Sequence, residues 1–153
     1  VLLDPNETAF GIVPVVPAEG TPAADAEPMG SILWLDLTVS DATRTQDFYQ
    51  QVVEWSVESV EMDDGGNRYA DYKMLGEDGA PVAGICHARG VNLGLPPVWM
   101  IYLPVDDFTE SLSRVEEEGG KVIKVKQGKD GEHVSAAVHD PVGVYFGLMP
   151  APE

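Results

Sequence analysis

The adjacent residues Cys86 and His87 are of types that could do chemistry. A thiol beside an imidazole could act as a nucleophile activated by a base. The surrounding sequence "VAGICH" is predicted to be a short strand, however, and neighbouring side chains on a strand point to opposite faces. The pattern therefore favours a packed thiol at Cys86 over a catalytic pair.

Asp36 is a second candidate, because it is a carboxylate in an otherwise apolar strand. Leu35, Leu37 and Val39 alternate there with Trp34 and Asp36. An enclosed carboxylate needs partners, which a backbone group or a tyrosine hydroxyl could supply. Two functional interpretations also remain open: a counter-ion for a cationic ligand, and a general base whose pKa is raised by burial.

The composition is strongly acidic. Asp and Glu number 26 against 9 Lys and Arg, which gives a formal net charge of −17 at pH 7. Such a surface repels nucleic acid phosphates and anionic lipid, so neither is an expected partner. The charge is typical of a solvated acidic surface, and the alternative is an acidic cleft that attracts a cationic ligand.

Length and cysteine content narrow the class of protein. The chain has 153 residues, enough for one domain with a substantial core. A single cysteine cannot form an internal disulfide, which predicts a reducing compartment, the cytoplasm. No run of 18 apolar residues occurs, so no membrane span is predicted.

The elements that would position the candidate residues occur in a repeated order. The first set is a strand, a helix and three strands: 30–41, a helix after the N-cap Asp41, 55–62, 68–75 and 82–87. The second set has the same order: 98–107, a helix between Asp107 and Gly119, 121–127, 133–139 and 144–149. The sequence therefore predicts an α+β fold with two βαβββ units, at residues 30–88 and 98–150.

The start of the chain resembles its end. "LLDPNETAFGIVP" from Leu2 and "VHDPVGVYFGLMP" from Val138 both contain Asp-Pro, then Phe-Gly, then Pro at equal spacing. Residues 1–13 are therefore predicted to be an extra strand matching the end of a βαβββ unit, either an extension or the remnant of a preceding domain. Its unpaired backbone groups predict docking on a sheet edge, either of its own chain or of a twofold-related partner. Residues 14–29 are predicted to be a linker and 30–153 the complete domain.

Four stretches of the paired units resemble a known family: "LDLTVSDATRTQDFYQQVVEW", "GAPVAGICHARG", "WMIYLPVDDFTESLSRVEEEGGKV" and "HDPVGVYFGLMP". Over roughly residues 30–150 the chain resembles the vicinal oxygen chelate superfamily, which includes glyoxalase I, extradiol dioxygenases and bleomycin resistance proteins. The resemblance implies that the two units form a cup-shaped mixed sheet around a pocket. It also implies a homodimer, the commonest symmetric assembly.

The resemblance further implies where a metal would bind. Metal-dependent members have donors at the positions of Trp34, Met100 and Gly147, and at Gly84 or Cys86. Trp, Met and Gly side chains cannot hold a hard divalent cation. We therefore expect no metal and no cofactor.

Strand alternation predicts which side chains line the pocket. They are aromatic, sulfur-containing or small, with one carboxylate: Trp34, Asp36, Cys86, Met100, Tyr102, Tyr145 and Gly147. Such a lining is typical of a small-molecule site. The predicted function is metal-free binding of a small organic molecule; the sequence leaves the ligand open, with a cation as one candidate class. The alternative is a lyase or isomerase of the glyoxalase type that uses Asp36, Cys86 or a displaced set of metal ligands.

Overall fold

The structure is a computed structural model that describes residues 1–14 and 31–152. Apart from Pro14, the linker predicted at 14–29 lies outside the described residues. The described chain contains two α-helices and a large mixed sheet, which confirms the predicted α+β class. None of its helices is long and apolar enough to cross a membrane.

Both predicted βαβββ units are present. The first contains β3 (Trp34–Val39), α1 (Ala42–Val53), β4 (Ser56–Asp64), β5 (Asn67–Leu75) and β6 (Pro81–His87). The second contains β7 (Trp99–Val105), α2 (Phe108–Glu117), β8 (Lys121–Gln127), β9 (His133–His139) and β10 (Tyr145–Pro150). A short 3-10 helix, Gly90–Asn92, lies in the connection between them.

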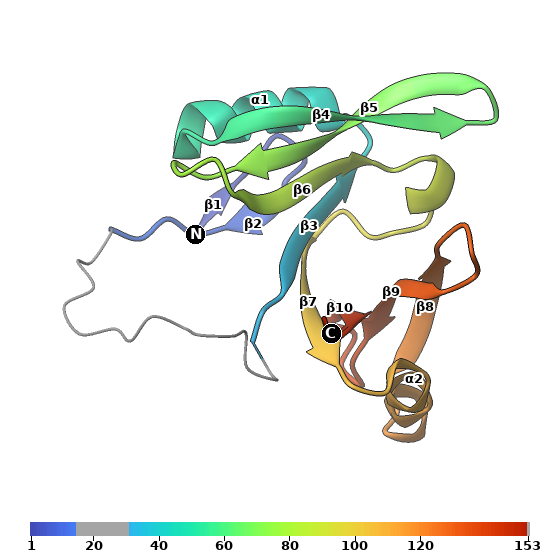
Figure 1. Ribbon diagram of the computed structural model, residues 1–153. Coiled ribbons are helices and arrows are strands. Elements are labelled where there is room, and N and C mark those ends of the chain that lie inside the picture. The colour runs from blue at the N-terminus through green and yellow to red at the C-terminus, as the bar shows by residue number, and fades with distance from the viewer. Residues whose placement is uncertain (15–30, 153) are drawn as a thin grey trace.

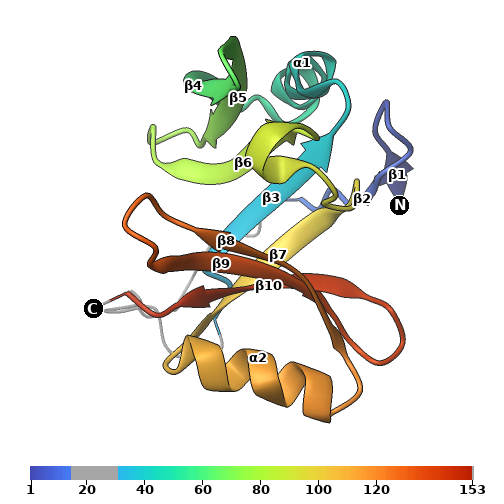
Figure 2. The same cartoon turned by 90° about the vertical axis from the view of Figure 1, so that its right-hand side faces the viewer.

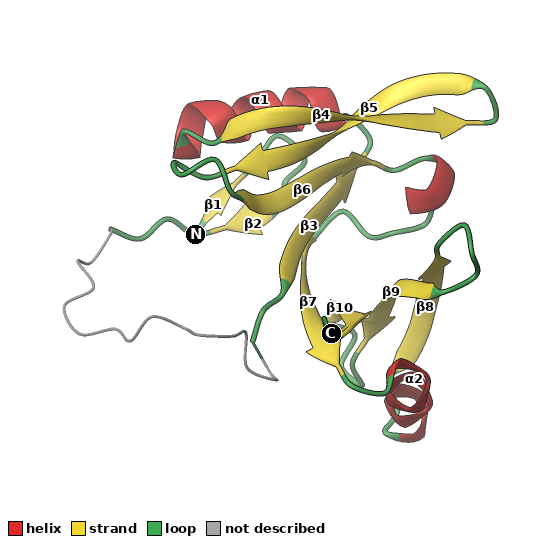
Figure 3. Cartoon of the chain, in the orientation of Figure 1, coloured by secondary structure: helices red, strands yellow, loops and turns green. Residues whose placement is uncertain are grey.

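The eight strands of the two units form one sheet, in the order β4-β5-β6-β3-β7-β10-β9-β8. The central strands β3 and β7 are antiparallel, and each runs parallel to the last strand of its own unit. Figures 1 and 2 show the two units at opposite ends of the molecule, with the sheet bending between them. Figure 3 shows that α1 and α2 lie on the outer sides of the two halves.

Each helix begins at the aspartate that the sequence predicts as its N-cap. The Asp41 carboxylate accepts a 2.9 Å hydrogen bond from the Arg44 amide, and Asp107 accepts one of 2.8 Å from the Glu110 amide. The apolar faces of the helices pack against the outer face of the sheet in two separate cores. The inner face of the bend is therefore free to form a site.

The N-terminal segment forms a hairpin, whereas its sequence predicts one strand docked on a sheet edge. β1 (Leu2–Leu3) pairs with β2 (Ala9–Phe10), so the hairpin satisfies its backbone groups internally. The hairpin packs beside α1 (Figure 2) and away from the edge strands β4 and β8. Three side-chain hydrogen bonds hold it: Tyr49 to Asp4, Asn6 to Thr45, and Thr8 to the Pro97 carbonyl.

Phe10 is the apolar anchor of this hairpin, because its ring meets those of Phe48 and Tyr49 edge-on at 5.8 and 5.3 Å between centroids. We expect Phe10→Ala to lower the free energy of unfolding by about 2 kcal/mol, since the ring is partly buried. Urea denaturation measures this. Ile12→Ala is the matched control, because Ile12 is 53% exposed and should change stability by less than about 0.5 kcal/mol. Equal effects of the two substitutions would show that the hairpin does not dock as described.

Candidate functional site

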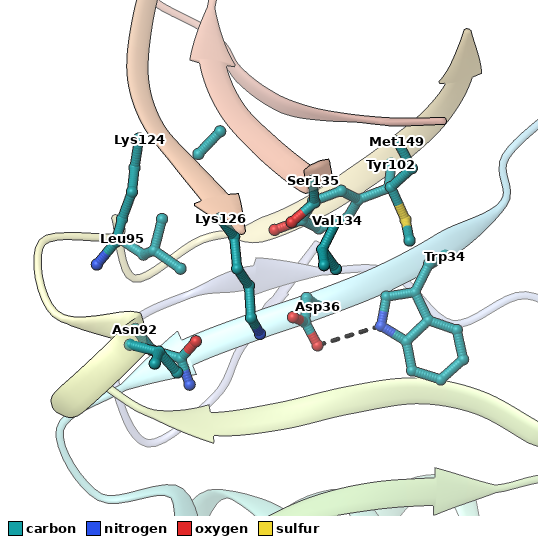
Figure 4. Close-up of a pocket in the computed structure, with 12 residues that line it drawn as sticks. Trp34, Asp36, Asn92, Leu95, Tyr102, Lys124, Lys126, Val134, Ser135 and Met149 are labelled. Atoms are coloured by element: carbon teal, nitrogen blue, oxygen red, sulfur yellow. Dashed lines mark hydrogen bonds between the residues drawn. The ribbon is translucent and has the colours of Figure 1, made fainter. Parts of the chain in front are cut away.

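Two hollows on the inner face of the sheet share four lining residues. One has a volume of about 150 Å³ and lies toward the second unit, and the other has about 180 Å³ and lies toward the first. Both are lined by Trp34, Asp36, Asn92 and Lys126. Figure 4 shows the first hollow, with Lys126 extending toward the carboxylate of Asp36. We call the two together the joint hollow.

Strand register brings the aromatic wall together. β3 and β7 pair so that Trp34 lies opposite Tyr102, and both side chains line the joint hollow. Tyr102 is 5% exposed, and burial, followed by the nearby Asp36 charge, raises the pKa of its hydroxyl. The tyrosine therefore stays protonated near neutral pH and can donate a hydrogen bond.

Asp36 lies where the two hollows meet. Its carboxylate accepts a 3.3 Å hydrogen bond from the Trp34 indole nitrogen and a weak one, at 3.9 Å, from the Cys86 thiol. Burial raises the pKa of Asp36 to about 6, although the Trp34 hydrogen bond and the Lys126 charge oppose part of this rise. Asp36 thus carries a negative charge at neutral pH that few protein groups neutralise.

Gly84 makes room for this carboxylate. It pairs with Asp36 across the parallel strands β3 and β6, and a Cβ built on Gly84 would overlap the Asp36 side chain. Any larger residue at position 84 would displace the carboxylate. The glycine therefore sets the orientation of Asp36.

Two lysines reach the joint hollow because β8 contains a bulge. Val122 pairs with Val138, yet Lys124 pairs with Ala137, so one extra residue of β8 is inserted at this point. Val122 belongs to the core beneath α2, while Lys124 and Lys126 line the hollow. Simple alternation would place both lysines on the same face as Val122. The two lysines are therefore absent from the predicted lining, because the strand pattern carries no signal of the bulge.

The two lysines differ in their partners. The Lys124 ammonium donates a 2.7 Å hydrogen bond to the Leu93 carbonyl. Lys126 makes no hydrogen bond or ion pair with the side chains and backbone of residues 1–14 and 31–152, and its charge acts on Asp36 at longer range. Lys126 lies on an edge strand and is exposed, so its long side chain can leave the hollow.

Three of the seven predicted lining residues lie outside the two hollows. Met100 is 3% exposed and packs with Tyr102 and Ala137 in a cluster beneath the lining. Tyr145 packs at the margin of the same cluster, with its ring against His139. Gly147 is covered, because the Tyr102 ring fills the space that a side chain there would need. The other four line the joint hollow: Trp34, Asp36, Cys86 and Tyr102.

Cys86 and His87 have separate partners. Cys86 faces the hollow, and burial and the Asp36 charge raise the pKa of its thiol. The Nδ1 atom of His87 lies 3.0 Å from the Ala70 carbonyl and 3.3 Å from Asp71 Oδ1. The thiol thus stays protonated and His87 is engaged elsewhere, which agrees with the packed thiol favoured by the sequence.

The residues at the four candidate metal positions do not fit a metal ion. Trp34 offers only an N–H donor, and Met100 is buried in an apolar cluster. Gly84 and Gly147 have no side chains, and the space above each is filled by Asp36 and Tyr102. Within the described chain, no three His, Cys, Asp or Glu side chains come together as a metal would require.

Comparison with known proteins agrees with this architecture. A model of the Glyoxalase/Bleomycin resistance protein/Dioxygenase superfamily matches residues 31–148. The Mycobacterium bovis protein named "Putative glyoxylase CFP32" is 28% identical over 122 residues, which cover 80% of this chain and 46% of the relative. Anthracycline biosynthesis protein DnrV of Streptomyces peucetius is 28% identical over 131 residues, which cover 78% of this chain and 46% of that protein.

Solved structures of low sequence identity also align with this chain. A glyoxalase/bleomycin resistance protein/dioxygenase superfamily member from Vibrio splendidus 12B01 aligns with a TM-score of 0.48 at 14% identity. The alignment covers 77% of this chain and 97% of that chain. By contrast, the chain spans about half the length of the curated relatives it matches.

Proposed function

Because the chain belongs to the glyoxalase/bleomycin resistance protein/dioxygenase superfamily, we propose that it binds a small organic molecule in the joint hollow without a metal. The observation that carries this proposal is the set of groups shared by the two hollows. Trp34 offers an aromatic face, and Asp36 and Lys126 offer charges of opposite sign. An apolar wall with a few polar groups is the usual composition of a ligand site.

The expected ligand is a cation, and Asp36 is its counter-ion. The other two lysines that line the joint hollow already have partners. Lys73 is paired with Glu58 at 2.8 Å, and Lys124 donates a hydrogen bond to the Leu93 carbonyl. Asp36 is fixed on a central strand, whereas Lys126 reaches toward it from an exposed edge strand. An organic cation can therefore displace the Lys126 ammonium and take its place beside Asp36. The Trp34 and Tyr102 rings add a favourable surface for such a cation.

The alternative function is a lyase or isomerase in which Asp36 is a general base. The observation in its favour is that burial raises the pKa of Asp36 to about 6, close to a working pH. In that case Asp36→Asn would abolish turnover of the substrate. A binding protein would show no turnover and would lose only affinity in the same variant.

Two charge substitutions test the binding proposal with a panel of organic amines and their neutral analogues. We expect Asp36→Asn to weaken amine binding about tenfold, because a charge-assisted contact is lost. Lys126→Met should strengthen it, because a competing cation is removed. Lys121→Met is the matched control, since Lys121 lies on the same strand outside both hollows. Titration by calorimetry at low salt measures all four proteins.

If an anion is bound instead, and Asp36→Asn strengthens its binding while Lys126→Met weakens it, the site belongs to an anion and the cationic proposal is contradicted. Equal affinity for amines and neutral analogues would also contradict it. Dialysis against a chelator should leave amine affinity unchanged. About one Ni, Zn, Fe or Mn ion per chain in elemental analysis, lost in Asp36→Asn, would overturn the metal-free part of the proposal.

A further inference from the structure

The side chain of Asn92 is held in one orientation by a buried carboxylate. Asn92 ends the short 3-10 helix between the two units and is 5% exposed. Its side-chain nitrogen donates a 3.0 Å hydrogen bond to Asp71 Oδ2, while Asp71 Oδ1 accepts from the His87 amide at 2.7 Å. An ionised carboxylate only accepts hydrogen bonds, so the nitrogen of the Asn92 carboxamide must face Asp71. The oxygen of that carboxamide therefore faces away from Asp71.

This oxygen, Asn92 Oδ1, is an acceptor that opens into the joint hollow. It accepts no hydrogen bond from residues 1–14 and 31–152, and it is not one of the unpaired side-chain atoms that are sealed from solvent there. Asn92 lines both parts of the joint hollow and is otherwise buried. Figure 4 shows its carboxamide directed toward Lys126 and Asp36. The hollow is thus where Asn92 Oδ1 can find a donor.

Asp36 presents a second free acceptor to the same hollow. Its two protein donors, the Trp34 indole and the Cys86 thiol, both lie at Oδ1. Within the described part of the chain, Asp36 Oδ2 accepts no hydrogen bond, and it too is not sealed from solvent. Two acceptors from separate elements, β3 and the connection between the units, therefore converge on one hollow.

A primary ammonium group already lies in this region. Figure 4 shows the end of the Lys126 side chain between the Asn92 carboxamide and the Asp36 carboxylate. All three residues line both parts of the joint hollow. Lys126 reaches this place from an exposed edge strand and hydrogen-bonds to neither acceptor. The space between the two acceptors thus suits an ammonium group, and the protein leaves both oxygens for another donor.

Building on the proposed binding of an organic cation, we infer that the cationic group of the ligand carries N–H bonds, which it donates to Asp36 Oδ2 and Asn92 Oδ1. The ligand class is a primary or secondary amine or an amidine, and a quaternary ammonium ion binds poorly. The rings of Trp34 and Tyr102 attract cations with or without N–H bonds, so they do not make this distinction. A methyl group facing the two oxygens would leave them unpaired, which makes Asn92 a specificity-determining residue.

Cumylamine and phenyltrimethylammonium test this inference, because at neutral pH both are cations of the same shape and only the first carries N–H bonds. We expect cumylamine to bind about tenfold more tightly in calorimetric titrations at low salt. Asn92→Ala should lower this affinity ratio about fivefold, by weakening cumylamine alone. Asn67→Ala is the matched control and should leave the ratio unchanged, since Asn67 is exposed and lies outside both parts of the hollow.

A second variant is needed because Asn92→Ala also takes a partner from the buried Asp71. Asp71→Asn keeps the shape of that residue but presents an amide nitrogen to Asn92, so the Asn92 carboxamide should turn and point its own nitrogen into the hollow. We expect the affinity ratio to fall again, because a donor replaces the acceptor. Loss of the Asp71 charge weakens both cations alike, so the ratio isolates the carboxamide. A purely structural role of Asn92 predicts an unchanged ratio in both variants.

The outcomes separate this inference from the proposed function. If both cations bind equally and Asp36→Asn weakens both, the cationic site stands and the inference is overturned. If neither cation binds, or Asp36→Asn has no effect, the cationic site itself is wrong and the inference fails with it. Stronger binding of phenyltrimethylammonium to Asn92→Ala, with cumylamine unchanged, would show selection by size and would also contradict the inference.

Discussion

Gly147→Ala is expected to lower the free energy of unfolding by about 3 kcal/mol, the upper end of the range for overpacking a core. The added methyl group would overlap the Tyr102 ring, which is itself confined by Met100 and Ala137. The ring cannot turn away without disturbing that cluster, because Tyr102 is 5% exposed. Urea denaturation of the wild type and the variant measures the difference.

A double variant and a matched glycine separate this cause from a general cost of replacing glycine. Tyr102→Ala removes the ring, so Gly147→Ala should cost at least 1 kcal/mol less in that background. Gly11→Ala occupies the equivalent place in the N-terminal hairpin, where no atom lies near, and should change stability little. Additive effects of the Gly147 and Tyr102 substitutions would contradict the proposed overlap.

Asp36→Asn is expected to stabilise the protein above neutral pH by about 2 kcal/mol, and to have no such effect near pH 4. Burial raises the pKa of Asp36 to about 6 in the folded protein, while an unfolded aspartate has a pKa of about 3.9. Between these values the folded protein keeps a proton that the unfolded chain releases. Stability therefore falls as the pH rises through this window, and the cost of the charged Asp36 remains above it.

Denaturation at several pH values between 4 and 8 measures the effect, with carboxyl NMR of Asp36 as a direct readout of its pKa. Lys126→Met should raise that pKa further, because the Lys126 charge opposes the effect of burial. Asp106→Asn is the control, since Asp106 is exposed. A stability gain in Asp36→Asn that does not depend on pH would show that burial of the charge is not its cause.

The sequence by itself determined the elements and their repeated order. Alternation of apolar residues marked β3 and β7, and Asp41 and Asp107 marked the starts of the two helices. These signals are local, because the apolar pattern of a strand or a helix repeats between residues two to four positions apart. For the same reason, alternation could identify Trp34, Asp36 and Tyr102 as residues of one face.

Only the tertiary structure decided which side chains reach the joint hollow. The bulge in β8 turns Lys124 and Lys126 toward it, and the connection between the units contributes Asn92. The Tyr102 ring covers Gly147, and Met100 packs in the cluster beneath the lining instead of in the lining itself. Each of these outcomes depends on strand register and on the size of neighbouring side chains that are distant in sequence. A bulge of one residue, for example, reverses the faces that alternation predicts for the rest of the strand.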